Sequence, residues 1–185
     1  ACKRGLGPAR HSSPFPMGKI LDLSNSEHPW SEGGPCHPRR TLVLGTWWLC
    51  REIELSNTLV SDIILDRVQG KATWNLSASK SDPSALGAAR SHLCSCSTST
   101  SSSSSAPARG SDPLCPFCLL EAQVTFARDY ATRGPQGTRG DQVPLFPNRP
   151  GACPSKRQVV STIVAAARAL GLPTQTVSGA QAWGG

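Results

Sequence analysis

The sequence predicts an α+β protein that is mostly helical, with one small antiparallel sheet and several segments that do not fold. Three observations lead to this class. Residues 41–50 and 155–170 have helical patterns, residues 61–93 alternate short apolar segments with turn residues, and all of residues 97–105 are Ser or Thr. In a chain of 185 residues, these elements fit one domain with appendages.

The first part of the chain differs in composition from the rest. Residues 1–37 are rich in Pro, Gly and Ser and show no sustained period, so we expect an extended or disordered lead-in. We assign residues 38–185 to one domain that is interrupted by a Cys- and Ser-rich insertion over 94–118. Because the chain begins with Ala1 and ends without a capping signal, we expect it to be a piece of a longer protein.

The first expected helix follows Pro38, which suits the first turn of a helix. Residues 41–50 are apolar on all sides, which is typical of a buried helix. Residues 51–55 continue this pattern, and Ser56-Asn57 marks its end. We therefore predict a continuous helical run up to residue 55.

The predicted sheet comes next. Residues 61–66 and 71–78 have the composition of short strands, and residues 79–83 are turn-forming. A return strand near 88–93 would complete an antiparallel hairpin.

Two further helices are predicted towards the end of the chain. The first covers about 116–133 and is closed by Gly134 and Pro135. The second covers 155–170, where Ser155 and Gln158 have the spacing of a capping box.

Charge and hydropathy limit the classes of function. The net charge is +7, and the basic excess lies in residues 1–40 and 121–185, on both sides of a balanced centre. This distribution suits a polyanion partner, although ordinary solubility charge explains it equally well. The longest mostly apolar run is far shorter than the roughly 20 residues that span a bilayer, so we predict no membrane segment. No basic-then-apolar leader is present, which favours a reducing, intracellular location.

Three motifs resemble, in order and spacing, the catalytic domain of tyrosine recombinases and phage-type integrases, especially those of eukaryotic mobile elements. Residues 45–55 with Ser61-Asp62-Ile63 resemble the first catalytic box, in which Arg-x-x-Glu-Leu precedes an Asp-Ile strand. Residues 79–82, Ser-Lys-Ser-Asp, resemble the turn of the strand-turn-strand lysine element. The helix over 155–170 falls where the family has the helix before its His-x-x-Arg box. The resemblance covers only the N-terminal part of such a domain.

The resemblance implies a partner and two catalytic residues. The partner is double-stranded DNA, within a complex in which the chain would associate with further copies. Arg51 would bind the non-bridging oxygens of the scissile phosphate through its planar guanidinium. Lys80 would donate a proton to the leaving 5′-oxygen. Glu54 would support Arg51 and would not act as an acid catalyst.

Other residues that the family requires do not occur in this chain. All four histidines precede residue 93, so a His-x-x-Arg box is absent. The only tyrosine, Tyr130, lies before the place of that box and cannot be the nucleophile by order. We therefore expect the chain alone not to cleave DNA.

Two close cysteine pairs form the sharpest local pattern, namely Cys94-x-Cys96 and Cys115-Pro-Phe-Cys118. Four thiolates in this arrangement predict a structural zinc site, with His92 as a substitute ligand. Two alternatives stay open: a glutaredoxin-like redox motif at 115–118, and cysteines that bind no metal.

The function has alternatives as well. One is a zinc-stabilised nucleic-acid-binding or interaction module without enzymatic ancestry. The other is a partly disordered gene remnant without a function.

Overall fold

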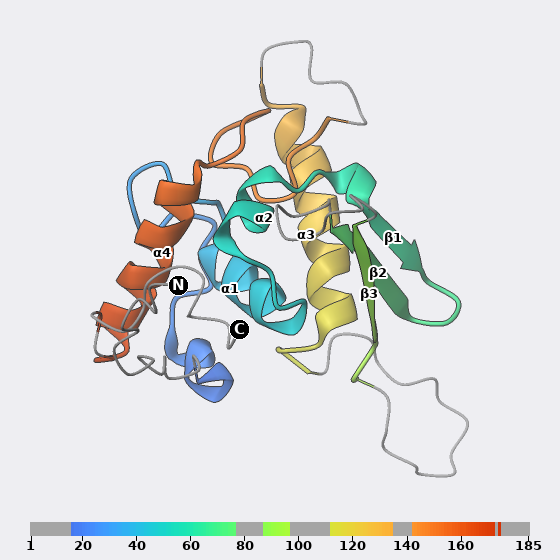
Figure 1. Cartoon of the computed structure of the whole chain (residues 1–185), viewed down its shortest axis with the longest axis horizontal. Helices are drawn as coiled ribbons and strands as arrows, with labels where there is room; N and C mark the ends of the chain where they lie inside the picture. Colours follow the sequence, from blue (N-terminus) through green and yellow to red (C-terminus); the bar gives the residue numbers. More distant parts are fainter. Residues whose placement is uncertain (1–15, 77–86, 97–111, 135–141, 173, 175–185) are drawn as a thin grey trace, which may run out of the picture.

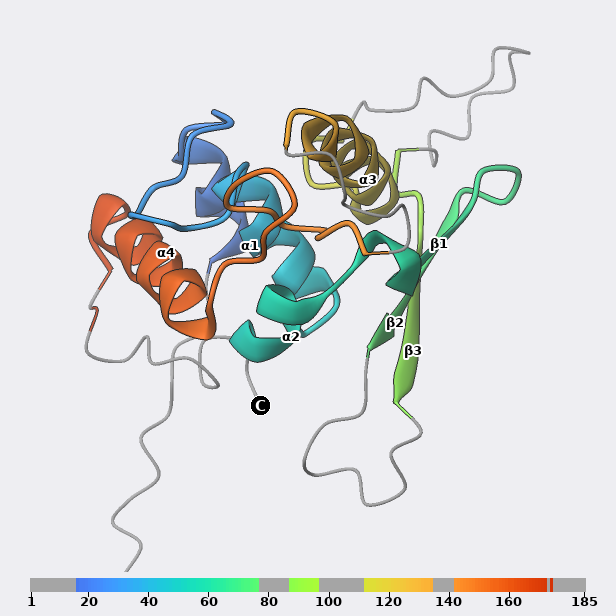
Figure 2. The same ribbon diagram turned by 90° about the horizontal axis from the view of Figure 1, so that it is seen from above.

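The computed structural model describes residues 16–76, 87–96, 112–134, 142–172 and 174. Over these residues the fold is α+β, as predicted, and its elements form layers (Figure 1). The helices are η1 (Met17–Asp22), α1 (Pro38–Trp47), α2 (Glu52–Asn57), η2 (Val60–Asp62), α3 (Pro116–Ala131) and α4 (Lys156–Ala169). Helix α4 lies on one side of α1 and α2, and the sheet and α3 lie on the other (Figure 2). Among the described residues, no helix has the length and apolar character needed to cross a bilayer.

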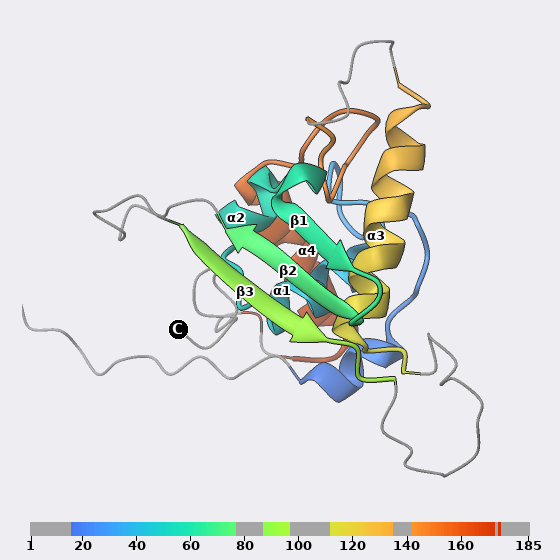
Figure 3. The ribbon, with the colours of Figure 1, turned by 90° about the vertical axis from the view of Figure 1, so that its right-hand side faces the viewer.

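The sheet has three antiparallel strands in the order β1-β2-β3: β1 (Ile63–Asp66), β2 (Lys71–Leu76) and β3 (Ala88–Leu93). The strand expected near 88–93 is confirmed as β3, which pairs with β2 to form the expected hairpin. The strand predicted over 61–66 is β1, and it pairs with the other edge of β2. Ala72, Trp74 and Leu76 alternate with more exposed residues, so one face of β2 is buried. Figure 3 shows the other face, which none of the described helices covers.

The core lies between the sheet and the helices, and Trp48, Trp74 and Phe146 are nearly inaccessible to solvent there. The ring of Trp74 lies 5.7 Å from that of Trp48 and 5.8 Å from that of Phe146, measured between centroids. Phe146 belongs to a segment that lies outside the helices and strands expected from the sequence. Its neighbour Leu145 donates its backbone N–H to the Thr58 carbonyl at 2.9 Å, which holds this segment against the core.

The expected continuous helix to residue 55 is wrong, because the chain turns between α1 and α2. Leu49 adopts a left-handed φ of 50° there, a conformation that does not continue a right-handed helix. The N–H of Cys50 donates to the Gly45 carbonyl at 2.9 Å and closes the end of α1. Helix α2 then begins after Arg51. We call residues 48–51 the arginine corner.

The second half of the expected lead-in is described, and it packs on the core. Residues 17–22 form η1, in which the Ile20 side chain is fully buried. The Arg39 guanidinium of α1 donates to the Leu21 and Leu23 carbonyls at 3.3 and 3.2 Å. Residues 1–15 lie outside the described part of the chain.

Helix α4 begins as the sequence predicts. The Ser155 hydroxyl accepts the Gln158 N–H at 3.3 Å, and the Gln158 side chain accepts the Ser155 N–H at 2.7 Å. This capping box satisfies donors that a helix start would otherwise leave unpaired. The buried stripe of Val159, Ile163 and Ala167 then faces the interior.

Candidate metal centre and arginine corner

The four cysteines that the sequence paired come together in space. Cys94 and Cys96 follow β3, Cys115 is the N-cap of α3, and Cys118 lies in the first turn of that helix. Their sulfur atoms all lie within 4.8 Å of one another. We call these residues the tetrathiol cluster, which could hold a metal ion.

Three of the six sulfur–sulfur separations have the length expected around a tetrahedral ion, and all six lie within 4.8 Å. The Sγ–Sγ distances are 3.6 Å for Cys94–Cys115, 3.8 Å for Cys94–Cys118 and 3.7 Å for Cys96–Cys118. A zinc–sulfur bond of about 2.3 Å in a regular tetrahedron separates the sulfur atoms by about 3.8 Å. All four are free thiols, and their separations exceed the roughly 2.05 Å of a disulfide bond.

A turn of the sheet positions the first cysteine pair. The Cys94 N–H donates to the Gly70 carbonyl at 2.8 Å. Gly70 has a φ of 63°, and a Cβ atom there would lie 3.3 Å from the Cβ of Cys94. A glycine therefore fits both the left-handed backbone and the close approach of the two segments.

Asp112 and Ser95 join the two halves of the cluster. One Asp112 carboxylate oxygen accepts the Leu114 N–H at 2.9 Å, and the other accepts the Ser95 hydroxyl at 2.6 Å. The Ser95 N–H also donates to the Cys115 sulfur at 3.4 Å. These supporting residues were not predicted from the sequence. Their one sequence signal is the turn-forming pair Asp112-Pro113 just before Cys115.

The thiols of the metal-free cluster resist ionisation. Burial and the neighbouring Cys115 thiol raise the pKa of Cys118. Burial is also the largest cause of the raised pKa of Cys94. The metal-free cluster therefore favours neutral thiols. A divalent cation stabilises thiolates, so its binding would release protons.

Two alternative interpretations of this region lack support. His92 lies outside the cluster, and its ring contacts those of Trp47 and Trp48 at centroid distances of 5.3 and 4.7 Å. A redox motif needs a preceding strand in a βαβ unit and a lowered thiol pKa. Here the sheet is antiparallel and the segment just before Cys115 is a turn, while the pKa of Cys118 is raised.

The arginine corner places Arg51 at the protein surface. Arg51 is exposed at the N-cap of α2, and its backbone N–H donates to a Glu54 carboxylate oxygen at 2.7 Å. Strand β3 holds the residues before it. The Arg90 guanidinium donates to the Trp48 carbonyl and, at 3.1 Å, to the Leu49 carbonyl. The Trp48 indole N–H donates to the Arg90 carbonyl at 3.0 Å.

Lys80 lies outside the described residues, in the connection between β2 and β3. Leu76 and Ala88, at the two ends of this connection, pair with each other. Arg90 lies two residues beyond Ala88. The connection therefore leaves the sheet at the end where Arg90 holds the arginine corner, on the α2 side in Figure 3.

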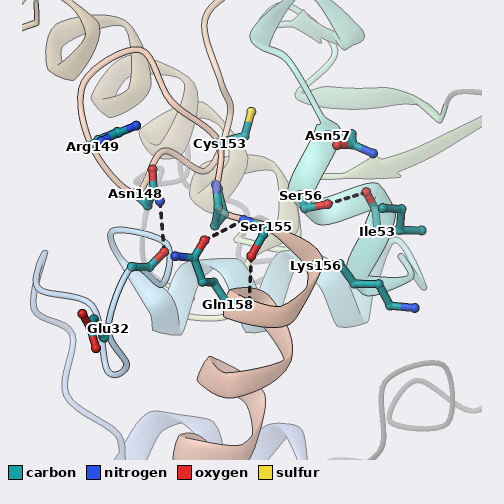
Figure 4. A pocket seen from close by; sticks show the side chains of 12 residues that line it. Glu32, Ile53, Ser56, Asn57, Asn148, Arg149, Cys153, Ser155, Lys156 and Gln158 are labelled. Carbon is teal, nitrogen blue, oxygen red and sulfur yellow. Dashed lines mark hydrogen bonds between the residues drawn. The ribbon is translucent and has the colours of Figure 1, made fainter.

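A polar cleft of about 730 Å³ lies between α2 and the start of α4 (Figure 4). Lys156 lines the cleft, and its ammonium contacts the buried Glu52 carboxylate at 3.1 Å. Neither Arg51 nor the tetrathiol cluster lines the cleft, so no predicted site residue within the described part of the chain belongs to it. It is lined by Glu32, Gly33, Ile53, Ser56, Asn57, Asn148, Arg149, Cys153, Pro154, Ser155, Lys156 and Gln158.

No family model, no curated protein and no solved structure matches this chain.

Proposed function

We propose that this chain binds double-stranded DNA as the arginine-bearing part of a tyrosine-recombinase-type domain that a structural zinc ion stabilises. The observation that carries the proposal is the exposed Arg51 at a corner whose backbone is fixed from two sides. Glu54 holds the N–H of Arg51, and Arg90 holds the carbonyls just before it. A guanidinium on such a base can bind two phosphate oxygens at once with little loss of freedom.

The position of the β2–β3 connection supports the same proposal. It carries Lys80 and leaves the sheet next to the strand residues that hold the arginine corner. We propose that this lysine contacts the same DNA backbone as Arg51. Tyr130, the only tyrosine, packs on Phe126 in α3 with a centroid distance of 5.1 Å. Because it precedes the place where the family has its nucleophile, the proposed role of this chain is binding without strand cleavage.

The tetrathiol cluster supports the zinc part of the proposal. Four cysteine ligands complete a tetrahedral shell and leave no open position for a water molecule or a substrate, as in structural zinc sites. The ion would connect the end of β3 with the start of α3. We assign it a structural role and no part in DNA chemistry.

Duplex DNA binding tests the proposal. We expect binding that weakens as salt rises and that falls by about tenfold in Arg51→Ala, since one phosphate contact is lost. The slope of log affinity against log salt should also decrease in magnitude by about one. Arg128→Ala is the matched control, because Arg128 is an exposed arginine on α3. Equal affinities of both variants, with unchanged near-UV circular dichroism, would refute the role of Arg51 and with it the recombinase-type proposal; no binding to duplex DNA at low salt would refute DNA binding altogether.

A second candidate function is an interaction module stabilised by zinc and unrelated to recombinases. The geometry of the tetrathiol cluster favours this alternative, since it does not depend on Arg51. One zinc ion per chain together with DNA binding that is indifferent to Arg51→Ala would select it.

A further inference from the structure

The two segments that supply the metal ligands also contact the arginine corner or the helix end before it. On the β3 side, His92 lies two residues before Cys94, and its ring contacts Trp47 and Trp48. On the α3 side, Leu114 directly precedes Cys115, and its carbonyl accepts the Trp47 indole N–H at 2.9 Å. The tryptophans at the end of α1 therefore contact both of the segments that carry the cluster cysteines.

Strand β3 connects the two regions directly. It runs from the α2 side of the sheet to the start of α3 (Figure 3). Near its beginning, Arg90 exchanges hydrogen bonds with Trp48. Just beyond its end, Cys94 enters the cluster. A shift of this strand relative to α3 would therefore move contacts in both places.

Besides the thiols, Ser95 links the end of β3 to the start of α3. The Ser95 hydroxyl bonds to Asp112, and the Ser95 N–H bonds to the Cys115 sulfur. An ion bound by all four sulfur atoms would fix the relative position of both segments. It would thereby also fix the Leu114 carbonyl and the His92 ring on which the end of α1 rests.

We propose that metal binding at the tetrathiol cluster orders the arginine corner and raises its affinity for the DNA backbone, although the metal ligands do not touch DNA. This inference rests on the DNA-binding function proposed above. Coupling between two sites typically changes affinity by about 5- to 150-fold and is reciprocal, so DNA should also tighten zinc binding.

The test adds zinc to chelator-stripped protein and follows two properties of the full chain. The first is duplex DNA affinity, which should rise by about tenfold or more when one equivalent of zinc binds. The second is amide hydrogen exchange of residues 48–51, which should slow without any DNA present. Unchanged exchange of these amides would overturn the coupling. Slower exchange without any DNA binding would leave the coupling standing and refute the proposed function.

A second variant keeps the test informative if the metal-free chain unfolds. Trp47→Phe removes the N–H that bonds to Leu114 and retains an aromatic ring against His92. With zinc bound, we expect unchanged metal stoichiometry, faster exchange at residues 48–51 and DNA affinity lower by about fivefold. Trp30→Phe is the matched control, since Trp30 is a partly buried tryptophan that precedes α1. If both variants behave like the unsubstituted chain, the tryptophan link does not transmit the effect.

Discussion

The two longest helices, α3 and α4, begin in different ways. Helix α4 begins with a reciprocal capping box in which Ser155 and Gln158 satisfy each other's backbone donors. Helix α3 begins at Cys115, whose side chain makes no capping hydrogen bond, and continues with Pro116. In its place, the first turn of α3 carries two members of the tetrathiol cluster.

The residues that stabilise the start of α4 are neighbours in the sequence, whereas those at the start of α3 come from distant parts of the chain. The capping box lies within four consecutive residues, so α4 can form its start without help from distant segments. The start of α3 relies on Cys94 and Cys96, about twenty residues earlier in the chain. We therefore expect the stability of α3 to depend on metal, and that of α4 to depend only on packing and its own cap.

Removal of the metal should have the largest effect. At a zinc concentration about 1,000 times the dissociation constant, bound zinc adds about 4 kcal/mol to the free energy of unfolding. Cys118→Ser or a chelator should therefore lower the denaturant midpoint. Hydrogen exchange should increase in β3 and the first turns of α3, with a much smaller change in α4. Cys153→Ser is the control, because Cys153 is exposed and lies outside the cluster. Equal loss of protection in α3 and α4 would contradict the distinction between the two starts.

Acidification should have the next largest effect on stability. It acts on the start of α1, which differs from the starts of both α3 and α4. Helix α1 follows His37, which has a left-handed φ of 49° and whose buried Nδ1 has no hydrogen-bond partner among the residues that the structure describes. Burial and the nearby Arg40 lower the pKa of His37 to about 4. Because the unfolded chain takes up this proton near pH 6.5, stability is lost as the pH falls below that value.

Because the His37 side chain is only partly buried, solvent screening reduces the effect, and the expected loss is about 1–2 kcal/mol between pH 7 and about pH 4.5, measured by urea unfolding at each pH. His37→Asn provides the reference, since asparagine tolerates the left-handed conformation and does not titrate in this range. The comparison cancels the zinc loss that acid causes in both chains. Parallel pH profiles for the two chains would show that His37 already titrates normally in the folded state.

Loss of the capping box should have a smaller and metal-independent effect. Ser155→Ala removes the acceptor of the Gln158 N–H and should cost about 1 kcal/mol of unfolding free energy. The cost should be the same with and without zinc, as judged by denaturation under both conditions. A cost that appears only in the zinc-bound chain would mean that the start of α4 is coupled to the metal site.

A surface ion pair should have the smallest effect. Arg67 in the β1–β2 turn contacts Glu121 of α3 at 2.6 Å, but the Arg67 side chain is 63% exposed. Exposed pairs contribute about 0.2–1 kcal/mol, so Arg67→Ala should change the unfolding free energy by no more than that. Thermal unfolding of the zinc-bound chain checks this value. A much larger loss would show that this contact, and not the metal, is what holds α3 to the sheet.

The fold class could be predicted because much of its information is local. The Ser155/Gln158 spacing, the apolar run in α1 and the turn residues between strands each act within a few positions. The break at the arginine corner could not be predicted this way. Leu49 adopts its left-handed conformation while Arg90, about forty residues later, binds the carbonyls at the end of the helix.

The four members of the tetrathiol cluster could be predicted from the sequence, but the residues that support them could not. Two close cysteine pairs indicate a zinc site by spacing alone. The roles of Gly70 and Asp112 depend on which segments meet in space, and the sequence does not encode that locally. The buried segment around Phe146 was missed for the same reason, because its burial comes from contacts with Trp74.

The most direct test of the central claim is the metal content of the purified chain and its relation to the four thiols. We predict one zinc ion per chain after purification without chelator, no zinc in Cys94→Ser/Cys118→Ser, and one zinc ion in Cys153→Ser. A chain that folds fully with no metal, or that keeps its zinc after both cluster cysteines are replaced, would contradict this account.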